Sequence, residues 1–565
     1  MVEKDIARCH PHRVPVTTAE LHGSHEMSTA PLTETTSVEV YDTTLRDGAQ
    51  QEGMNLSVAD KLAIAPLLDE LGVTSIEGGW PGAIPKDTEF FAKAAKELTL
   101  TNAELAAFGS TRKPGTTAHQ DTQVRALVDS EAPIITLVAK SDIRHVERAL
   151  RTTGEENLAM IADTVSYLRE AGRRVIIDAE HFFDGYRYDP TYALRAVTTA
   201  LEAGADVVAL CDTNGGMLPD WVHEIVTTVA ARTDGTLGIH AHNDSGCAVA
   251  NSMAAVAAGA RHVQGCVNGY GERTGNADLL AVVANLELKL GLRTLTGAGL
   301  EEVTRIAHAV SEITNIAPFA RQPYIGASAF AHKAGLHASA IRIDPDLYQH
   351  IDPRQVGNDM RMLVSDMAGR ASIELKGREL GFDLGGQPDL LGRITARVKD
   401  AEANGYTFDA ADASFDLLLR EEVTGRRPSY FRVESWRAIV EHGGTPNGTD
   451  ADVSSEATVK LHAGDTRVVS TGEGNGPVNA LDHALRLALG KAYPQIEDFE
   501  LIDYKVRLLD SAHGTDAITR VLIEHTDGQR SWSTVGVGGN LLEASWEALV
   551  DGMVYGLLLG EVEPL

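Results

Sequence analysis

The sequence predicts an α/β protein whose first half is a closed (β/α)8 barrel. Two observations predict this fold: short β-branched runs alternate with longer helical patterns between residues 38 and 290, and eight such runs occur there. Eight βα units in about 250 residues are typical of a closed barrel of parallel strands. The alternative is an open doubly wound sheet, but no glycine-rich dinucleotide turn follows the first run. We therefore expect the barrel.

The β-branched runs set the expected strands, and amphipathic patterns set the helices between them. Strands are expected at 38–42, 73–78, 103–108, 134–139, 174–179, 206–211, 236–241 and 262–267. Helical segments include Ser57–Leu71, Asn157–Gly172, Pro190–Gly204 and Gly246–Gly259. Several end on the glycine that commonly follows the last turn of a helix.

Composition and charge restrict the class of protein. A chain of 565 residues is long enough for two or more domains, and 80 acidic against 50 basic residues give a formal net charge of −30. Such a charge argues against a nucleic-acid or anionic-membrane surface. No apolar run reaches the roughly 18 residues that a membrane span needs. The four cysteines form no CxxC pair, so we expect a soluble enzyme in the reducing cytoplasm.

The barrel is expected to span residues 36–295, after an N-terminal leader. Residues 1–35 are rich in His, Thr, Ser and Pro and lack an apolar h-region, which excludes a secretory signal. We expect this leader to be disordered, and Met27 offers an alternative start.

Polar residues follow the carboxyl ends of the expected strands, where a barrel places its catalytic groups. They are Asp42, Arg46 and Asp47 after the first strand, Glu77 at the second, Glu180 at the fifth, Asp212 and Thr213 after the sixth, His240 and His242 at the seventh, and Gly269–Asn276 after the eighth. We expect these side chains to converge on one mouth of the barrel.

The pair His240 and His242 predicts a metal site. Residues at i and i+2 on a strand point the same way, so both imidazoles can reach one cation, and the carboxylate of Asp47 would complete the set. Burying two imidazoles without a shared ligand would cost desolvation energy. Asp42 is expected either as a turn residue or as a ligand, and Asp244 as the N-cap of the next helix.

Three motifs together resemble a known family. They are Asp42–Gly48 (DTTLRDG), His240–Asp244 (HAHND) and Gly271–Asn276 (GERTGN). In this order and at this spacing they are similar to the metal-dependent Claisen-condensing TIM barrels that include isopropylmalate, homocitrate and citramalate synthases and related lyases. The resemblance implies the condensation of acetyl-CoA, as co-substrate, with a 2-oxo acid.

The resemblance also implies roles for residues of the barrel. The metal would be held by Asp47, His240 and His242 with Asn276 close by, Arg46 would face the keto oxygen, Thr213 would bind the substrate carboxylate, and Glu180 would support the site. Arg46 would then stabilise the alkoxide that develops when the polarised ketone is attacked. These ligand types do not choose among Mg, Mn, Zn and Co.

A base that deprotonates the acetyl methyl group is expected beyond the barrel. Residues 296–425 resemble the helical linker subdomains of the family, in which His332 matches the catalytic histidine and Tyr348 matches a tyrosine of the active site. In the family this linker commonly reaches the barrel of the partner subunit, so both residues are expected to act either within one chain or in trans. His337 and His350 are expected to be surface histidines.

The last 130 or so residues contain an internal repeat with a spacing of about 64 residues. Gly464–Thr471 followed by Asn479–Leu485 parallels Gly528–Thr534 followed by Glu543–Leu549. Residues 428–565 resemble the regulatory domain of isopropylmalate and citramalate synthases, in which paired βββα units form a dimer and bind an end-product amino acid. Such a ligand is expected at the turns Gly472–Gly476 and Gly536–Gly539, and dimerisation without an effector is the alternative.

Residues outside the metal motif favour one reaction of the family. The lyases use a cysteine in the loop after the eighth strand, where this chain has Tyr270 and Gly271. The segment His332–Gly335 (HKAG) resembles citramalate and homocitrate synthases, and homocitrate synthases generally lack the terminal domain. Trp80 lies at the mouth of the second strand, where it would either shrink the pocket to suit pyruvate or simply pack.

We therefore expect a homodimeric enzyme that condenses acetyl-CoA with pyruvate to give citramalate and CoA, on a route to isoleucine, with isoleucine as the effector. Glu77 and Trp80 join Arg46 and Thr213 as expected substrate-binding residues. Condensation with 2-oxoisovalerate, as in isopropylmalate synthases, is the alternative within the family. An inactive metal-binding regulatory protein is the alternative of another class.

Overall fold

The computed structural model describes residues 37–442, 453–509 and 517–564. The expected leader, residues 1–35, lies outside this described part of the chain. The chain divides into two compact units, Met1–Gly299 with Glu312–Ile316, and Leu300–Ser311 with Ala317–Leu565.

The first unit contains a closed barrel of eight strands in chain order, which confirms the predicted fold and rules out the open sheet. All neighbouring strands are parallel, and β1 closes the barrel by pairing with both β2 and β8. The strands are β1 (Glu39–Asp42), β2 (Ser75–Gly79), β3 (Glu104–Ser110), β4 (Ile134–Lys140), β5 (Arg174–Glu180), β6 (Val207–Asp212), β7 (Thr236–Ala241) and β8 (His262–Gly265).

Several strand boundaries differ from expectation by one or two residues, and two of them have a clear local reason. β2 begins at Ser75 because Gly72, with φ of 94°, ends the preceding helix in the left-handed conformation. β8 ends at Gly265 because the chain turns into a 3-10 helix at Val267–Gly269.

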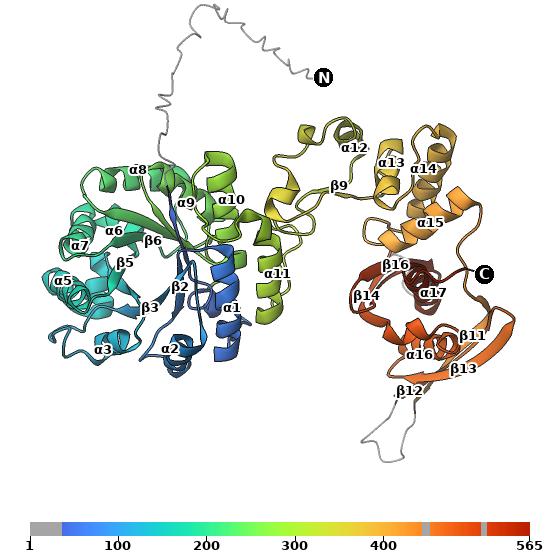
Figure 1. Cartoon of the computed structure of the whole chain (residues 1–565), viewed down its shortest axis with the longest axis horizontal. Helices are drawn as coiled ribbons and strands as arrows, with labels where there is room; N and C mark the ends of the chain where they lie inside the picture. Colours follow the sequence, from blue (N-terminus) through green and yellow to red (C-terminus); the bar gives the residue numbers. More distant parts are fainter. Residues whose placement is uncertain (1–36, 443–452, 510–516, 565) are drawn as a thin grey trace, which may run out of the picture. The chain divides into compact units, whose positions relative to one another are not determined.

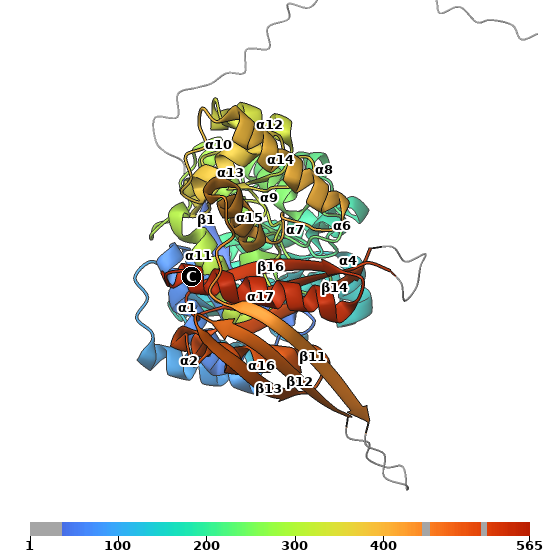
Figure 2. The ribbon, with the colours of Figure 1, turned by 90° about the vertical axis from the view of Figure 1, so that its right-hand side faces the viewer.

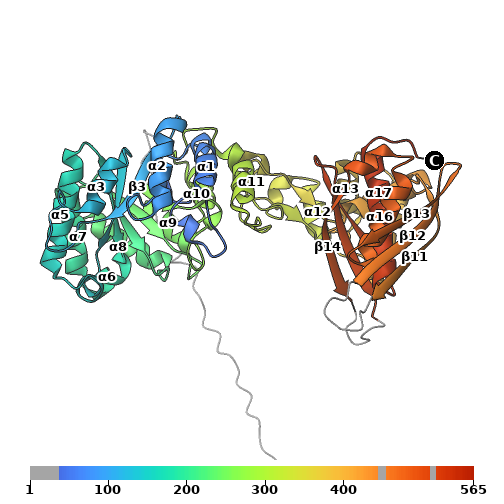
Figure 3. The ribbon, with the colours of Figure 1, turned by 90° about the horizontal axis from the view of Figure 1, so that it is seen from below.

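Helices lie around the outside of the strands (Figures 1 and 3). In α1 the Ser57 side chain accepts from the Asp60 N–H and the Asp60 carboxylate accepts from the Ser57 N–H, a reciprocal capping box. The helices of this part are α1 (Val58–Leu71), α2 (Pro85–Glu97), α3 (Thr122–Asp129), α4 (Ile143–His145), α5 (Gly154–Glu170), α6 (Phe182–Tyr188), α7 (Pro190–Glu202), α8 (Pro219–Ala230), α9 (Ala248–Ala257) and α10 (Leu279–Leu290); α11 (Val303–Thr314) follows.

Inward-facing side chains fill the barrel interior. A buried cluster of inward residues from five strands fills the centre, namely Tyr41, Ala106, Ile134, Ile176 and Val207. Because alternate residues of a strand share a face, the next inward positions lie two residues nearer the carboxyl ends. On β3 and β5 those positions are Phe108 and Asp178.

The second unit begins with short helices. It contains the parallel bridge strands β9 (Ala331–His332) and β10 (Arg361–Met362) and the helices α12 (Gly335–Ile341), α13 (Arg370–Glu379), α14 (Pro388–Ala403) and α15 (Asp412–Thr424). Helices α13, α14 and α15 contribute to one hydrophobic core that includes Ile373, Ile394 and Phe415.

Two βββα modules complete the second unit and confirm the predicted internal repeat. β11 (Arg432–His442), β12 (Val453–Ala463) and β13 (Thr466–Gly474) form one antiparallel sheet, against which α16 (Pro477–Leu489) packs. β14 (Glu500–Leu508), β15 (Thr519–Thr526) and β16 (Ser531–Gly538) form the other, with α17 (Leu541–Leu559) against it (Figure 2). Among the helices that the structure describes, none has the length and apolar character needed to cross a membrane.

Candidate active site

The three expected metal ligands lie together at the carboxyl ends of β1 and β7. Asp47 follows β1 through a tight turn, His240 is in β7 and His242 comes directly after it. All three are buried, and one potential ligand atom from each lies within 4.8 Å of the others. His240 Nε2 is 3.4 Å from Asp47 Oδ2.

These residues fit a divalent cation. Asp47 Oδ1, His242 Nδ1 and Asn276 Oδ1 are buried and have no hydrogen-bond partner among the described residues. Leaving such atoms unpaired is costly unless a ligand satisfies them. Asn276 forms a β-bridge with His242, and its amide donates to the Tyr270 carbonyl at 3.1 Å, which leaves its oxygen free for a cation. Oxygen and imidazole nitrogen together suit a divalent ion.

For Asp47 and His242 the electrostatics favour the protonation states that metal binding requires. Burial alone would lower the pKa of His240, but the Asp47 contact raises it. Burial alone would raise the pKa of Asp47, but the Arg46 charge and the His240 contact hold it well below its usual range. Burial, with the neighbouring His240, lowers the pKa of His242 to about 4. At neutral pH Asp47 is therefore a carboxylate and His242 is neutral, as ligands must be.

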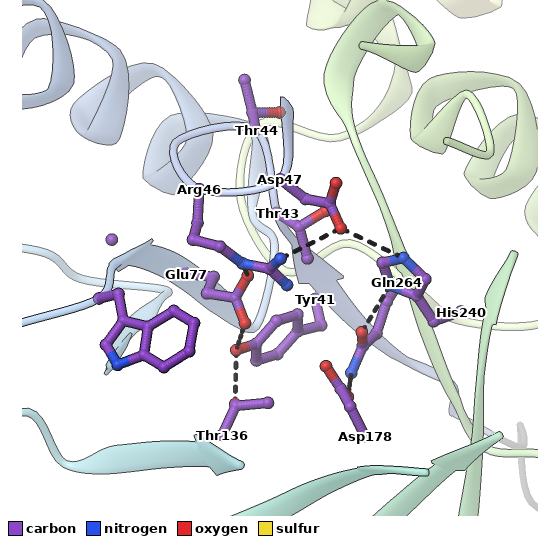
Figure 4. Close-up of polar contacts among 12 residues, drawn as sticks. Tyr41, Thr43, Thr44, Arg46, Asp47, Glu77, Thr136, Asp178, His240 and Gln264 are labelled. Carbon is purple, nitrogen blue, oxygen red and sulfur yellow. Dashed lines mark hydrogen bonds and ion pairs between the residues drawn. The ribbon is translucent and has the colours of Figure 1, made fainter. Parts of the chain in front are cut away.

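Arg46 is held in one orientation by contacts on three sides (Figure 4). Its Nε donates to Glu77 Oε2 at 2.5 Å, and its NH1 donates to Asp47 Oδ2 at 3.2 Å. The guanidinium lies 3.8 Å from the centre of the Phe108 ring. Glu77 also accepts from the Tyr41 hydroxyl at 2.9 Å. Glu77 is fully buried, so the structure places it behind Arg46.

Trp80 also packs against Phe108. Its ring meets Phe108 edge to face, with ring centroids 5.2 Å apart. The indole Nε1 is buried and has no partner within the described part of the chain. The backbone N–H of Trp80 donates to Asp87 Oδ2 at 2.8 Å, and Asp87 in turn forms a buried ion pair with Lys61.

Thr213 and Glu180 also come to this end of the barrel. Thr213 directly follows β6, and its hydroxyl accepts from the His181 N–H at 2.9 Å. Glu180 ends β5 and forms an ion pair with Lys140. Both side chains are partly exposed at this end of the barrel.

Two aspartates that had alternative interpretations are now assigned. Asp42 is the turn residue: its carboxylate accepts from the Thr44 N–H and hydroxyl at 2.9 and 2.8 Å, and burial raises its pKa to about 7. The prediction that Asp244 caps the next helix was wrong. Helix α9 begins at Ala248, whose N–H donates to Asn243, while Asp244 forms an ion pair with Arg273 at 2.8 Å.

The expected linker residues lie in the second unit. His332 is half-buried in β9, and its Nε2 has no hydrogen-bond partner among the described residues. The ring of His337 stacks on Tyr348 at 4.1 Å and lies 6.1 Å from the ring of His332. His337 is therefore half-buried between them rather than a surface histidine, whereas His350 is exposed as expected.

Four residues of this arrangement escaped the sequence analysis, namely Tyr41, Phe108, Asp178 and Gln264. Each lies on a barrel strand, and the amide of Gln264 lies between His240 and Asp178. Asp178 follows the apolar residues Val175–Ile177 of β5, and a polar residue inside such an apolar strand was a signal that could have identified it. No comparable signal marks Gln264, because β8 also contains His262.

Comparison with known proteins agrees with this arrangement. The model of the HMGL-like family matches residues 37–310, the homocitrate synthase post-HMGL domain-like model matches 324–405, and the LeuA allosteric (dimerisation) domain model matches 409–557.

Similar proteins match almost the whole chain. An (R)-citramalate synthase of Streptomyces coelicolor is 63% identical over 528 residues, covering 94% of this chain and 98% of the relative. The enzyme of that name from Synechocystis is 49% identical, covering 93% and 97%. A 2-isopropylmalate synthase of Methanocaldococcus jannaschii is 31% identical, covering 91% and 94%.

Proposed function

The chain belongs to the family of (R)-citramalate synthases, and we propose that it condenses the acetyl group of acetyl-CoA with pyruvate to give citramalate and CoA. The observation that carries this function is 63% identity over nearly the full length of both chains. The isopropylmalate synthase is a more distant relative, at 31% identity. Pyruvate, the acceptor that the sequence predicts, is therefore proposed over 2-oxoisovalerate. The similarity to citramalate synthases and the match to the HMGL-like family both favour an acetyl-CoA condensing enzyme over the alternative, an inactive metal-binding regulatory protein.

We assign the metal to Asp47, His240 and His242, with Asn276 beside them, and Mg, Mn, Zn and Co all fit this donor set. When bound, such an ion supplies Lewis acidity at the 2-oxo group of pyruvate. The three unpaired buried ligand atoms support this assignment.

Arg46 is proposed to face the keto oxygen and to stabilise the negative charge that develops on it. Its contacts with Glu77, Asp47 and Phe108 keep the guanidinium in place, so little reorganisation accompanies the reaction. Glu77 would then act indirectly, because it orients Arg46 and does not contact the substrate itself. We propose that Thr213 binds the carboxylate of pyruvate and that Glu180 supports the site.

His332 is the proposed base that removes a proton from the methyl group of acetyl-CoA, and Tyr348, stacked on the neighbouring His337, is proposed to belong to the same site. Burial, with a contribution from His337, lowers the pKa of His332, so the imidazole is neutral and able to accept a proton at neutral pH. The resulting carbon nucleophile attacks the keto carbon, a new C–C bond forms, and water then hydrolyses the thioester to release CoA.

The chain is proposed to work as a cytoplasmic homodimer, with a barrel over 36–295, linker subdomains over 296–425 that act in one chain or in trans, and a terminal domain over 428–565. Isoleucine is the proposed effector of the terminal domain. A cavity of about 1080 Å³ within the terminal domain supports this proposal. It is lined by Gly476, which belongs to one of the two turns expected to bind the ligand, and by His483, Arg486 and Tyr504.

The acceptor can be tested by measuring the release of CoA thiol from acetyl-CoA with pyruvate and with 2-oxoisovalerate. We expect a higher kcat/KM for pyruvate. A preference for the branched acid would overturn the proposed reaction. Release without either 2-oxo acid gives the background hydrolysis of the thioester.

A further inference from the structure

A line of hydrogen bonds runs through the barrel interior to one of the proposed metal ligands. His240 Nδ1 lies 2.8 Å from Gln264 Oε1, and Gln264 Nε2 lies 2.8 Å from Asp178 Oδ1 (Figure 4). Gln264 Nε2 is also 3.3 Å from His262 Nε2, and His262 Nδ1 is 3.3 Å from Glu39 Oε2. The line therefore connects three strands, β1, β7 and β8, with β5 at its side.

Two acceptors determine which way the Gln264 amide faces. Carboxylate oxygens accept hydrogen bonds, so the amide nitrogen of Gln264, not its oxygen, faces Asp178 Oδ1 and donates to it. Turning the amide over would place two acceptor oxygens 2.8 Å apart at buried positions. The amide oxygen must therefore face His240.

His262 favours the same orientation of the Gln264 amide. Its Nδ1 faces the Glu39 carboxylate, which Arg174 holds at 2.6 Å, so Nδ1 carries the hydrogen. In the neutral ring with this tautomer, the other ring nitrogen has a lone pair that can accept the second N–H of Gln264, 3.3 Å away. Both hydrogens of the amide are thus used, and both partners favour the same orientation.

The orientation of Gln264 decides the tautomer of His240. Because the amide oxygen is an acceptor, His240 Nδ1 must carry the ring hydrogen, and the lone pair of a neutral ring is then on Nε2. Nε2 is the atom that faces Asp47, at 3.4 Å from its Oδ2. In the opposite tautomer Nε2 would carry a hydrogen and could not bind a cation.

We propose that Gln264, oriented by Asp178 and His262, is a positioning residue that selects the metal-binding tautomer and ring orientation of His240. This inference rests on the proposed metal site. Partners of this kind typically change metal affinity by about 10- to 100-fold when removed.

The test uses the full-length protein stripped of metal, with Mn²⁺ as the probe and free Mn²⁺ measured by electron paramagnetic resonance. Gln264→Met keeps the volume but removes the acceptor, and we expect its Kd for Mn²⁺ to rise by about 10- to 100-fold. Gln264→Glu keeps an acceptor oxygen toward His240 when its other oxygen carries the hydrogen that Asp178 accepts, and its Kd should then stay near that of the wild type.

The opposite order would overturn the proposal. If Gln264 only filled space, apolar Met would be tolerated and Glu, placed beside Asp178, would not. Thr164→Val is the matched control. The buried Thr164 hydroxyl on α5 donates to the Met160 carbonyl and accepts from the Arg112 N–H, and its loss should leave the Kd unchanged. If thermal unfolding shows that Gln264→Met does not fold, Asp178→Leu, which frees the amide to turn, should raise the Kd instead.

His242→Ala separates this inference from the metal assignment. Wild-type Mn²⁺ affinity in His242→Ala would refute the metal site itself. Loss of Mn²⁺ in His242→Ala with wild-type affinity in Gln264→Met would refute only the positioning role.

Discussion

Arg46 and Trp80 contact the same aromatic side chain from two directions. The guanidinium lies over the face of Phe108, and the indole meets the ring edge to face. The backbone of Trp80 is fixed as well: its backbone N–H donates to Asp87, and the buried Lys61 forms an ion pair with that carboxylate at 2.5 Å. A rigid bulky ring thus stands beside the arginine proposed to face the keto oxygen.

Trp80→Leu should enlarge the space beside Arg46 and change the choice of acceptor. We expect kcat/KM for 2-oxoisovalerate relative to pyruvate to rise by about tenfold, the scale of one or two methylene groups in a hydrophobic pocket. The CoA-thiol assay with both acids measures this ratio. Trp221→Leu, on the outer helix α8 where Trp221 contacts Arg187, is the control. An unchanged ratio in Trp80→Leu would mean that the ring only packs.

Helix α1 is tied to the start of β3 by a single carboxylate. Asp69, in the last turn of the helix, accepts from the backbone N–H groups of Thr101, Asn102 and Ala103 at 2.9, 2.7 and 2.8 Å. These bonds satisfy the loop that leads into β3, the strand that carries Phe108. The element boundary therefore depends on one side chain 32 to 34 positions earlier in the chain.

Asp69→Asn should lower the free energy of unfolding by about 1–3 kcal/mol at neutral pH, since bonds to a charged acceptor are replaced by weaker ones. Burial alone would raise the pKa of Asp69, but the backbone N–H bonds lower it below the usual 3.8. A lowered pKa contributes stability above the unfolded-state pKa, and this contribution is lost as the pH falls through the folded-state pKa.

The difference between wild type and Asp69→Asn should therefore be constant near pH 7 and shrink as the pH falls below 3.8. Urea unfolding across this range measures it. Asp60→Asn, which loses a single N–H bond at the start of the same helix, should have a smaller effect. A difference that does not change with pH would contradict the role of the charge.

At the scale of the whole molecule, the second unit joins the linker helices to the terminal repeat by polar contacts. Tyr406 donates to Glu547 of α17 at 2.7 Å, and the other oxygen of Glu547 accepts from the Val537 N–H at 2.9 Å. Close by in the chain, Asp409 forms an ion pair with Lys333 at 2.6 Å, next to His332. These contacts connect helix α17 of the terminal repeat to the linker segment that contains the proposed base, His332.

Tyr406→Phe should weaken inhibition by isoleucine, the proposed effector, and leave turnover without isoleucine unchanged. Removing one contact between the two parts is expected to shift the isoleucine concentration for half-inhibition by about fivefold, the lower range of allosteric coupling. Turnover measured against isoleucine concentration at fixed pyruvate gives this shift. Tyr192→Phe, which removes a buried hydroxyl contact with Asn157 in the barrel, is the control. Identical inhibition curves would exclude a role of this contact in the inhibition.

Local pattern was enough to predict the architecture and part of the site. Eight β-branched runs predicted the barrel, and the internal repeat, through its resemblance to a regulatory domain, predicted the two βββα modules. His240, His242 and Asp47 could be grouped because a strand places i and i+2 on one face and a barrel gathers strand ends. Both rules depend only on short-range periodicity.

The partners of these residues could not be predicted in the same way. Gln264 meets Asp178 across 86 positions of sequence, and Asp244 pairs with Arg273 instead of capping the helix that follows it. By itself, the sequence determined the barrel, the terminal repeat and the metal-binding residue types. Only the tertiary structure decided which buried polar groups pair and so how Arg46 and His240 are oriented, because a hydrogen bond selects its partner by distance in space, not by position along the chain.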